Sequence, residues 1–217
     1  MLCPLKNTPR WARRKEARPQ ELLDAALDLF VERGFAATRL DDVAKQAGVS
    51  KGTLYLYYSS KEDLFKAVVR ENIIPLLGEA ELIVNDYAGT SAALLRDIVL
   101  GWWARIGETR LSGITKLIMA EAGNFPDLAA FYHEEVIQRG NAMIARVIGR
   151  GIDSGEFSVR DPIQTTSVIV APVMMLIMWK HSFGGPCAIQ TLSPQAYLHG
   201  FMDVLLHGLL SQPARPV

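Results

Sequence analysis

Hydroxyl, ring and cationic side chains gather within residues 50–57, and they are the groups of this sequence best suited to contact another molecule. The group comprises Ser50, Lys51, Thr53, Tyr55, Leu56 and Tyr57. Hydroxyls and a lysine donate hydrogen bonds to phosphates and to base edges in a DNA groove, and rings add flat contact area. With Val49 and Leu54 turned inward, helical spacing places this group outward. The stretch therefore predicts a helix that presents one face to a major groove.

Two short helices around a tight turn would position that face. Thr38 is expected to cap the first helix, with Asp41 in the capping-box position. Gly48 ends this helix because glycine can adopt a positive φ, and Ser50 is expected to cap a second helix over residues 51–58. This is the form of a DNA-reading helix-turn-helix. The alternative is an ordinary helical hairpin with core tyrosines, which has no need of so many exposed hydroxyls around one lysine.

Helices are also predicted on both sides of this pair. Residues 21–34 carry apolar side chains at helical spacing and end on Gly34 as a C-cap. After the pair, Ser60 is expected to cap another helix, with Asp63 in the box position. Lys61 then lies at a helix N-terminus, where the helix dipole disfavours a cation, so we infer that Lys61 and free backbone N–H groups hold a phosphate together. The alternative is a solvated surface lysine.

Several positions within residues 20–66 have residue types that hydrophobic spacing does not explain. They occur within a longer pattern that consists of Ala25-Ala26, Phe30, Gly34-Phe35, Thr38, the run from Ala47 to Tyr55, Tyr57-Tyr58 and the run from Ser60 to Leu64. This stretch closely resembles the DNA-binding domain of the TetR family of bacterial transcription regulators. Tyr58 departs from the pattern, since the family usually has Phe there. Leu56 occupies a variable, groove-facing position, where it either touches a thymine methyl or contributes little to reading the operator.

The resemblance implies a homodimer that binds a partly palindromic operator and is released by a small molecule bound in its C-terminal domain. The expected DNA interface consists of Thr38, Arg39, Ser50, Lys51, Gly52, Thr53, Tyr55, Leu56, Tyr57 and Lys61. Of these, Thr38 and Lys61 are expected at phosphates, and the side chains of the second helix are expected to carry the sequence specificity.

The formal net charge of this 217-residue chain is zero, but its charges are unevenly distributed. Residues 1–59 hold ten Lys and Arg against seven Asp and Glu, and residues 60–217 hold thirteen against sixteen. Most of the basic excess falls in residues 1–19, which prolines interrupt. We expect a disordered basic arm there that lies along phosphates or enters a minor groove; the alternative is a solubilising tail. The predicted domains are this arm, a helix-turn-helix domain over residues 20–66, and a helical effector-binding and dimerisation domain over residues 67–217.

Signals for several other classes of protein are absent from the sequence. No apolar segment follows the first basic residues, so no signal peptide is expected and the protein is placed in the cytoplasm, associated with the nucleoid. The longest apolar run, Val168–Trp179, is too short to cross a bilayer. Cys3 and Cys187 have no metal-ligand spacing and fit a reducing compartment. Without nucleotide-binding or nucleophile motifs, we expect no cofactor, no metal and no enzymatic activity.

The remaining chain is predicted to form helices only, which makes the fold class all-α with about nine helices. An N-terminal three-helix helix-turn-helix domain would precede a C-terminal helical ligand-binding and dimerisation domain. Pro75 is expected to bend or end the helix that starts at Lys61. Later helices are predicted over residues 91–108, 112–122, 126–152, 161–182 and 193–210. The stretches 121–128 and 154–157 resemble those of drug- or lipophile-responsive TetR members, less closely than the N-terminal match.

The last two predicted helices indicate self-association. Val168–Trp179 is apolar all the way round, so its own domain must cover one face and something else the other. Ala196, Gly200 and Gly208 lie on one face of the final helix and would let another helix approach closely. We expect a four-helix seam between two subunits, whose symmetry would match a palindromic operator; the alternative is a monomer with a thick core. Pro172 is expected to kink the first of these helices.

An effector pocket is expected among the middle helices, with a wall rich in rings and sulfur. The candidate lining residues are Trp102, Trp103, Ile106, Met119, Phe125, Phe131, Met175, Met178 and Trp179. Most side chains of this kind belong to a core, which is the alternative for each of them. Few charges occur among these positions, which favours a lipophilic, neutral or weakly cationic ligand, with His181 or Arg105 as a polar anchor.

The sequence thus predicts a sequence-specific DNA-binding transcriptional regulator, a repressor released from a palindromic operator by a small lipophilic ligand. Two alternatives remain open: a TetR-like protein controlled by a protein partner, and an enzyme with an incidental helix-turn-helix. The interior of the body distinguishes the three. A ligand sensor needs a cavity lined by rings with few polar groups, a partner-binding body needs an exposed apolar patch, and an enzyme needs convergent titratable groups.

Overall fold

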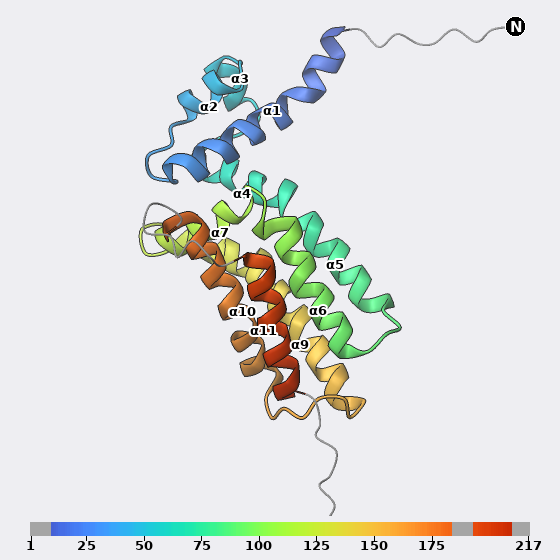
Figure 1. Cartoon of the computed structure of the whole chain (residues 1–217). Coiled ribbons are helices and arrows are strands. Elements are labelled where there is room, and N and C mark those ends of the chain that lie inside the picture. The colour runs from blue at the N-terminus through green and yellow to red at the C-terminus, as the bar shows by residue number, and fades with distance from the viewer. Residues whose placement is uncertain (1–9, 184–192, 210–217) are drawn as a thin grey trace, which may run out of the picture. The chain divides into compact units, whose positions relative to one another are not determined.

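The all-α prediction is confirmed over the part of the chain that the computed structural model describes, residues 10–183 and 193–209 (Figure 1). Side chains are described for residues 19–182 and 193–208. The chain divides into two compact units, Met1–Val69 and Arg70–Val217, called here the head and the body. Cys3, Cys187 and residues 1–9 of the predicted arm lie outside the described residues.

Four short or medium helices build the head and lead out of it. They are α1 (Arg10–Arg33), α2 (Leu40–Gln46), α3 (Lys51–Tyr55) and α4 (Lys61–Asn72) (Figure 1). Three fully buried rings, Phe30, Phe35 and Phe65, form the centre of the core, with ring centroids 5.5–5.7 Å apart. Val43 of α2 and Leu54 of α3 are also fully buried. Because helices as short as α2 and α3 are not stable alone, this burial is what holds them in place.

The body contains the remaining helices. They are α5 (Ile74–Asp86), α6 (Ser91–Trp102), α7 (Ser112–Glu121), α8 (Pro126–Tyr132), α9 (Gln138–Asp153), α10 (Pro162–Met178) and α11 (Pro194–Leu209). The π-helical segments η1 (Trp103–Gly107), η2 (His133–Ile137) and η3 (Trp179–Phe183) extend α6, join α8 to α9, and extend α10. Counted with these extensions, and with α4 and α5 taken as one helix interrupted at Ile73, the described residues form the nine helices predicted.

Most of the predicted helix boundaries are confirmed because their signals are local. Ser50, Ser60 and Asp161 each accept hydrogen bonds from backbone N–H groups in the first turn of a helix. Gly34 and Gly48 adopt φ values of 83° and 67° where predicted helices end. As predicted, the helix from Lys61 also ends near Pro75, which lies in the first turn of α5.

Two predictions about the head differ from the structure. α1 begins at Arg10, so the predicted disordered arm is helical from residue 10 onward. The prolines suggested an interrupted segment, but residues 10–18 are mostly good helix formers, and the helix continues through Pro19. Thr38 does not cap α2, because the helix begins at Leu40 with Arg39 at the N-cap and no side-chain cap. The Thr38 hydroxyl donates to carbonyls of the preceding segment instead.

A compact turn after α9 anchors the start of α6. Gly151 lies against the ring of Phe157 so closely that any side chain there would overlap it. The carboxylate of Glu156 then accepts hydrogen bonds from the backbone N–H groups of Ser91 and Ala92, at 2.7 and 2.8 Å. A carboxylate at a helix N-terminus satisfies free N–H groups and complements the helix dipole. The turn therefore fixes the helix that carries part of the cavity wall described below.

Among the described residues, α10 is covered on only one side. With η3 it forms an apolar helix, Pro162–Ser182, of 21 residues, which is sufficient in length and composition to cross a membrane, and 28% of its most apolar window is buried. Core helices of non-membrane proteins can meet the same criterion. Ile169 and Val173 are buried, whereas Val168 and Met175 are exposed. The sequence predicted one face covered by its own domain and another left for a further partner, and the single chain shows that uncovered face.

Candidate DNA interface and ligand cavity

α3 presents an exposed face that is partly apolar. Tyr55, Leu56 and Tyr57 expose 46%, 83% and 37% of their surface. Leu54, on the opposite side of the helix, is fully buried and packs α3 into the head. Clustered large side chains at a surface are a mark of an interaction site. The structure thus exposes Tyr55, Leu56 and Tyr57, three of the predicted base-reading side chains, at the end of α3 and directly after it.

The first turn of α3 holds polar groups that are already ordered. Ser50 Oγ accepts a hydrogen bond from the Thr53 N–H at 3.1 Å and lies 2.8 Å from Thr53 Oγ1. Lys51 Nζ lies 2.8 Å from a carboxylate oxygen of Asp41 and 5.9 Å from the ring centroid of Tyr55. The hydrogen bond and the charge of Asp41 raise the pKa of Lys51. The lysine therefore keeps its charge, and it would exchange Asp41 for a phosphate or base on binding DNA.

Gly52 lies in the same turn, and the protein itself does not require a glycine there. A side-chain carbon added at this position would meet only Ser50 Oγ, at 3.8 Å. The residue is exposed and lies inside a helix, where glycine is less favourable than alanine. Close approach of another backbone is a role that only glycine serves. Its predicted place in the DNA interface fits this geometry.

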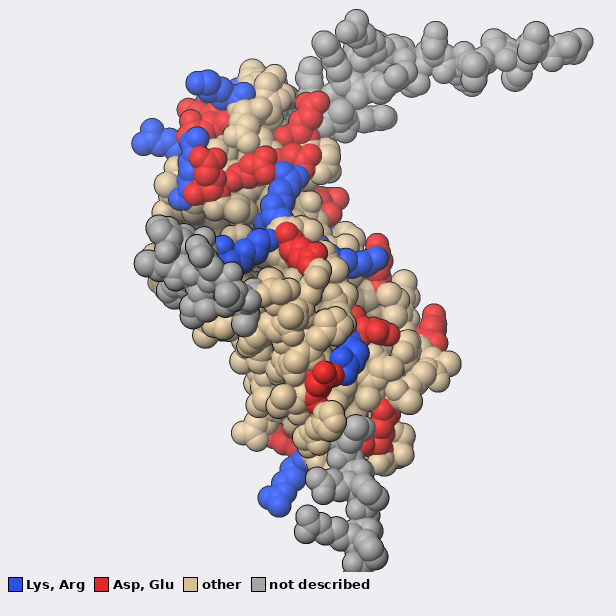
Figure 2. All heavy atoms as spheres, in the orientation of Figure 1, with Lys and Arg blue, Asp and Glu red and all other residues tan. Residues whose placement is uncertain are grey.

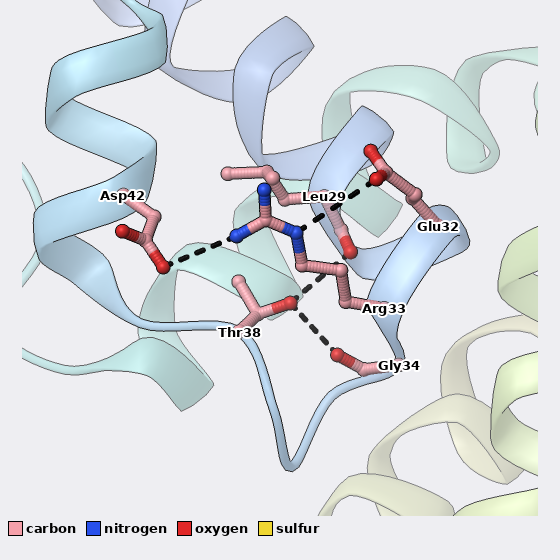
Figure 3. Close-up of polar contacts among 6 residues, drawn as sticks. All are labelled: Leu29, Glu32, Arg33, Gly34, Thr38 and Asp42. Atoms are coloured by element: carbon pink, nitrogen blue, oxygen red, sulfur yellow. Dashed lines mark hydrogen bonds and ion pairs between the residues drawn. The ribbon is translucent and has the colours of Figure 1, made fainter.

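Thr38 lies inside the head rather than on its surface. It is 1% exposed, and its hydroxyl donates to the carbonyl oxygens of Gly34 and Leu29, at 2.7 and 3.1 Å (Figure 3). The hydroxyl joins the end of α1 to the segment that leads into α2 and is not presented to a phosphate. Arg39, the next residue, is exposed.

Lys61 also has partners within the head. Its Nζ donates to the carbonyl oxygens of Phe35 and Ala36, at 2.7 and 3.1 Å, and lies 4.5 Å from the ring centroid of Phe35. These contacts explain a lysine at a helix N-terminus without a phosphate. The cation donates hydrogen bonds to carbonyl oxygens of the segment that follows α1. The predicted phosphate contact of Lys61 stays a prediction.

Acidic and basic side chains are mixed over the head. Arg33 lies 3.2 Å from Asp42 and 3.9 Å from Glu32 (Figure 3). On the face drawn in Figure 2, blue and red side chains are interspersed around these helices. Over residues 19–69, the part of the head whose side chains are described, the surface therefore carries no single sign of charge.

A cavity of about 410 Å³ lies among the helices of the body. Helices α5 to α10 all contribute to its wall, and no charged residue lines it. Trp102, Ile106 and Met119 of the predicted set are in the wall. Its volume and apolar lining are typical of small-molecule sites.

The other residues predicted to line the pocket lie elsewhere. They are Trp103, Phe125, Phe131, Met175, Met178 and Trp179. Trp103 packs in the core against Gly107, and Trp179 packs edge-on against Tyr197 with ring centroids 5.8 Å apart. Met175 is exposed on α10. Ring and sulfur content does not tell which face of a helix lines a cavity, and the predicted ligand contacts stay predictions.

Sequence reasoning missed a buried polar pair in the cavity wall. The hydroxyl oxygens of Thr115 on α7 and Tyr132 on α8 lie 2.9 Å apart, with 7% and 3% of the residues exposed. Burial raises the pKa of Tyr132 to about 12, although the Thr115 hydrogen bond acts in the opposite direction. A threonine between apolar residues on the buried side of α7, next to Ile114 and three residues before Ile118, is the signal that would have indicated this site.

Neither predicted polar anchor lies in the wall of this cavity. Arg105 lines a smaller groove of about 140 Å³ instead. His181 Nε2 lies 2.8 Å from Ser112 Oγ. Burial lowers the pKa of His181, and the charges of Lys180 and Lys116 lower it further.

α10 and α11 expose an uncharged surface in the body. Its exposed residues are Ile163, Val168 and Met175 on α10, and Ala196, Gly200, Val204 and Gly208 on α11. The four residues on α11 recur at every fourth position, and nothing lies within 4 Å of a side-chain carbon added at Gly200 or Gly208. In Figure 2 most of the surface over these two helices is tan. We call this surface the α10–α11 face.

Comparison with protein families agrees with this architecture. Residues 22–68 match the family described as bacterial regulatory proteins, tetR family, and residues 93–207 match the AefR-like transcriptional repressor C-terminal domain. The two matches give the chain the two-part arrangement of a transcription regulator, a helix-turn-helix head followed by a helical body. The chain belongs to the TetR family.

Individual relatives match part of the chain in sequence, and solved structures match the fold. The HTH-type transcriptional regulator RutR of Escherichia coli (strain K12) is 39% identical over 88 residues, 41% of this chain, which matches 42% of the length of that relative. The fatty acid metabolism regulator protein of Bacillus subtilis (strain 168) is 26% identical over 65% of this chain and 73% of its own. Among solved structures, FadR of Bacillus subtilis in complex with stearoyl-CoA has a TM-score of 0.71 at 21% identity, covering 87% of this chain and 98% of that one. A transcriptional regulator of Saccharomonospora viridis in complex with choline has a TM-score of 0.75 at 21% identity, covering 91% and 100%.

Proposed function

We propose that this protein is a sequence-specific transcriptional repressor that binds a two-fold symmetric DNA operator as a homodimer in the cytoplasm and is released by a small lipophilic ligand. The single observation that carries the proposal is the outward face of α3, where Tyr55, Leu56 and Tyr57 are exposed while Leu54 is fully buried. A helix fixed by its apolar side and exposed on its polar and aromatic side is suited to a major groove. Membership of the TetR family supports the same function.

In the proposed complex, contacts divide between bases and backbone. Lys51, Thr53, Tyr55 and Tyr57 would read base edges, with Leu56 at a thymine methyl. Ser50, Gly52, Arg39 and Lys61 would lie at the sugar-phosphate backbone, which sets register but carries no sequence information. Thr38 would act indirectly, because its hydroxyl is used to shape the turn between α1 and α2.

Dimer formation would use the α10–α11 face. Apolar side chains such as Val168 and Val204, exposed by 58% and 77%, are costly to leave in water. Two helices from each subunit would form a four-helix seam, with the small residues of α11 allowing close approach. A two-fold seam of this kind gives two heads related by the symmetry that a palindromic operator requires.

Ligand control is supported by the cavity. Its volume of about 410 Å³ and its uncharged wall fit a small lipophile better than control by a protein partner, which would need no apolar cavity. Relatives and neighbours include a fatty acid metabolism regulator and regulators crystallised with stearoyl-CoA or choline. These names support a ligand-responsive body in general and do not fix the ligand of this chain.

The proposed release mechanism runs through α4. Ile73, directly after this helix, lines the cavity, and Arg70 in its last turn lies 2.9 Å from Glu135 and 5.0 Å from the ring centroid of Phe131. A ligand that rearranges the wall near Tyr132 would therefore move the end of α4, whose first residue, Lys61, is hydrogen-bonded within the head. The two recognition helices would then no longer match the roughly 34 Å between successive major grooves. Near-complete release requires a ligand preference of about 5.5 kcal/mol for the released form.

The test is selection of bound DNA from a random pool, followed by affinity measurements. The wild-type protein is expected to enrich a two-fold symmetric site, and Tyr55→Ala should lower the ratio of specific to non-specific affinity by about tenfold or more. Leu82→Ala, which removes an exposed apolar side chain from α5, is the matched control and should leave the ratio unchanged. Failure to enrich any sequence, or an unchanged ratio in Tyr55→Ala, would contradict the proposal.

A further inference from the structure

The cavity wall combines uncharged lining with one buried pair of hydroxyls, and this combination restricts the chemistry of the ligand. The pair is Thr115 and Tyr132, joined by one hydrogen bond of 2.9 Å. Asn141 and Ser167 are the other polar side chains of the wall, and both are more exposed than the pair. The rest of the wall is hydrocarbon, sulfur or glycine apart from the indole of Trp102.

Two hydroxyls that share one hydrogen bond leave one O–H without an acceptor. One hydroxyl donates its hydrogen to the other, and the second hydroxyl still has its own hydrogen to donate. Within the described part of the chain, neither oxygen has another hydrogen-bond partner. A buried donor that stays unpaired costs about 1–3 kcal/mol, so this O–H favours any ligand that offers an acceptor to it.

Charged ligands do not fit this wall. A carboxylate or phosphate buried here would find no Lys, Arg or His among the lining residues, and a quaternary ammonium would find no carboxylate and only one indole and one phenol ring. Burying a charge without a partner is expensive, and recognition of quaternary ammonium ions uses several rings together. The phenol cannot supply a charge either, since its pKa of about 12 keeps it protonated at neutral pH.

We infer that the ligand is an uncharged, mainly hydrocarbon molecule with one neutral oxygen acceptor, such as an ester or ketone carbonyl, which accepts a hydrogen bond from the Thr115–Tyr132 pair. The inference rests on the proposed function, because it specifies the ligand class of the same cavity. This chain would therefore differ in ligand class from proteins that bury a charged end of their ligand. The tyrosine and threonine are thus assigned as specificity-determining residues of the cavity.

The experiment compares four probes with matched chains: methyl laurate and dodecane below their solubility limits, and laurate and dodecyltrimethylammonium below their micelle-forming concentrations. Binding to the full-length protein without DNA is measured by thermal shift and calorimetry. Methyl laurate should bind about tenfold more tightly than dodecane, and the two ions should bind more weakly than the ester. Equal binding of all four probes, tighter binding of either ion, or no binding of methyl laurate would overturn the inference.

Variants of Thr115 and Tyr132 test whether the hydroxyl pair causes the preference for methyl laurate over dodecane. Tyr132→Phe keeps the ring and removes one hydroxyl, so it should lower affinity for methyl laurate by less than the loss of both hydroxyls, because Thr115 still has an O–H to donate, and it should leave dodecane binding unchanged. Because this variant leaves Thr115 without its partner, the double variant Thr115→Val with Tyr132→Phe removes both hydroxyls at similar volume and should keep the fold while losing the ester preference. Tyr87→Phe, outside the cavity, is the control. A wild-type ester preference in the double variant would assign recognition elsewhere and overturn the inference.

Operator release is measured separately, so the two proposals can fail independently. A protein that binds DNA specifically but prefers laurate keeps the proposed function and loses the inferred ligand class. A protein that prefers methyl laurate through Tyr132 but binds no DNA sequence specifically keeps the cavity chemistry and loses the repressor function. Where both hold, operator DNA must weaken binding of the ester by the same factor by which the ester weakens DNA binding.

Discussion

The free protein does not require a glycine at position 52, whereas the proposed DNA complex does. We predict that Gly52→Ala stabilises the protein by up to about 1 kcal/mol, because alanine is the better helix former and a side-chain carbon there meets only Ser50 Oγ at 3.8 Å. The same methyl group should weaken operator binding, because it would lie where the sugar-phosphate backbone approaches α3. Thermal unfolding and operator titration measure the two effects.

The control for this prediction is Gly149→Ala in α9. This residue also lies within a helix, with nothing within 4 Å of an added side-chain carbon. It should raise stability by a similar amount and leave DNA binding unchanged. Unaltered operator affinity in Gly52→Ala would remove Gly52 from the DNA interface.

Thr38 and Lys61 have hydrogen-bond partners that their residue types and positions in the sequence do not indicate. Both residue types are common phosphate ligands, and both have suitable positions near a helix N-terminus. Their hydrogen bonds to Gly34, Phe35 and neighbouring carbonyls depend on how the segment between α1 and α2 folds back. That geometry is set by non-local packing, so residue type and spacing alone could not predict it.

His181 makes the stability of the body dependent on pH through the contact of η3 with α7. Its folded-state pKa is lowered from 6.5, first by burial and then by Lys180 and Lys116. The unfolded chain therefore binds a proton more readily, so this contribution to the free energy of unfolding is fully present above about pH 6.5 and decreases as the pH falls below it. We predict a smaller loss of stability on acidification for His181→Gln than for the wild type.

Denaturant unfolding at several pH values between neutral and mildly acidic measures this difference. His133→Gln is the matched control, since His133 is an exposed histidine of η2. It should follow the wild-type curve. Parallel curves for His181→Gln and the wild type would show that Ser112 and its surroundings accept the protonated ring without cost.

At the level of elements, helix boundaries were more predictable than helix faces. Caps such as Ser50 and Asp161 act within one turn, so their sequence signals survive in any tertiary context. By contrast, the sequence does not show that Glu156 caps α6, because its partners Ser91 and Ala92 are distant in the chain. The sequence also does not show the π-helical segment after Trp102, which changes the direction of the side chains that follow it, so that Ile106 lines the cavity and Trp103 packs in the core.

For the whole molecule, the seam between subunits can be tested at Gly200. Gly200→Leu should not disturb the single chain, because the position is exposed and nothing lies within 4 Å of an added side-chain carbon. Across a symmetric seam the leucine would appear in both subunits and separate the helices, at a cost of about 1–3 kcal/mol per site. We predict a smaller particle in light scattering and weaker operator binding.

Gly200→Ala is the conservative control and should remain dimeric, because a methyl group adds little volume. Helix content measured by circular dichroism should be the same in both variants. A Gly200→Leu protein with wild-type mass and wild-type operator affinity would exclude the α10–α11 face as the dimer contact.

The α10–α11 face belongs to the body, whereas the DNA-reading face of α3 belongs to the head. A chain with a damaged α3 would therefore still pair with an intact chain when both are made in one cell. Each mixed dimer would hold only one competent head, and a single head reaches only one half of a symmetric operator. With equal amounts of the two chains, most dimers would carry at least one damaged head, so mutations in α3 should be genetically dominant over the intact gene. Mutations that break the α10–α11 face should instead be recessive, because such chains cannot enter a mixed dimer.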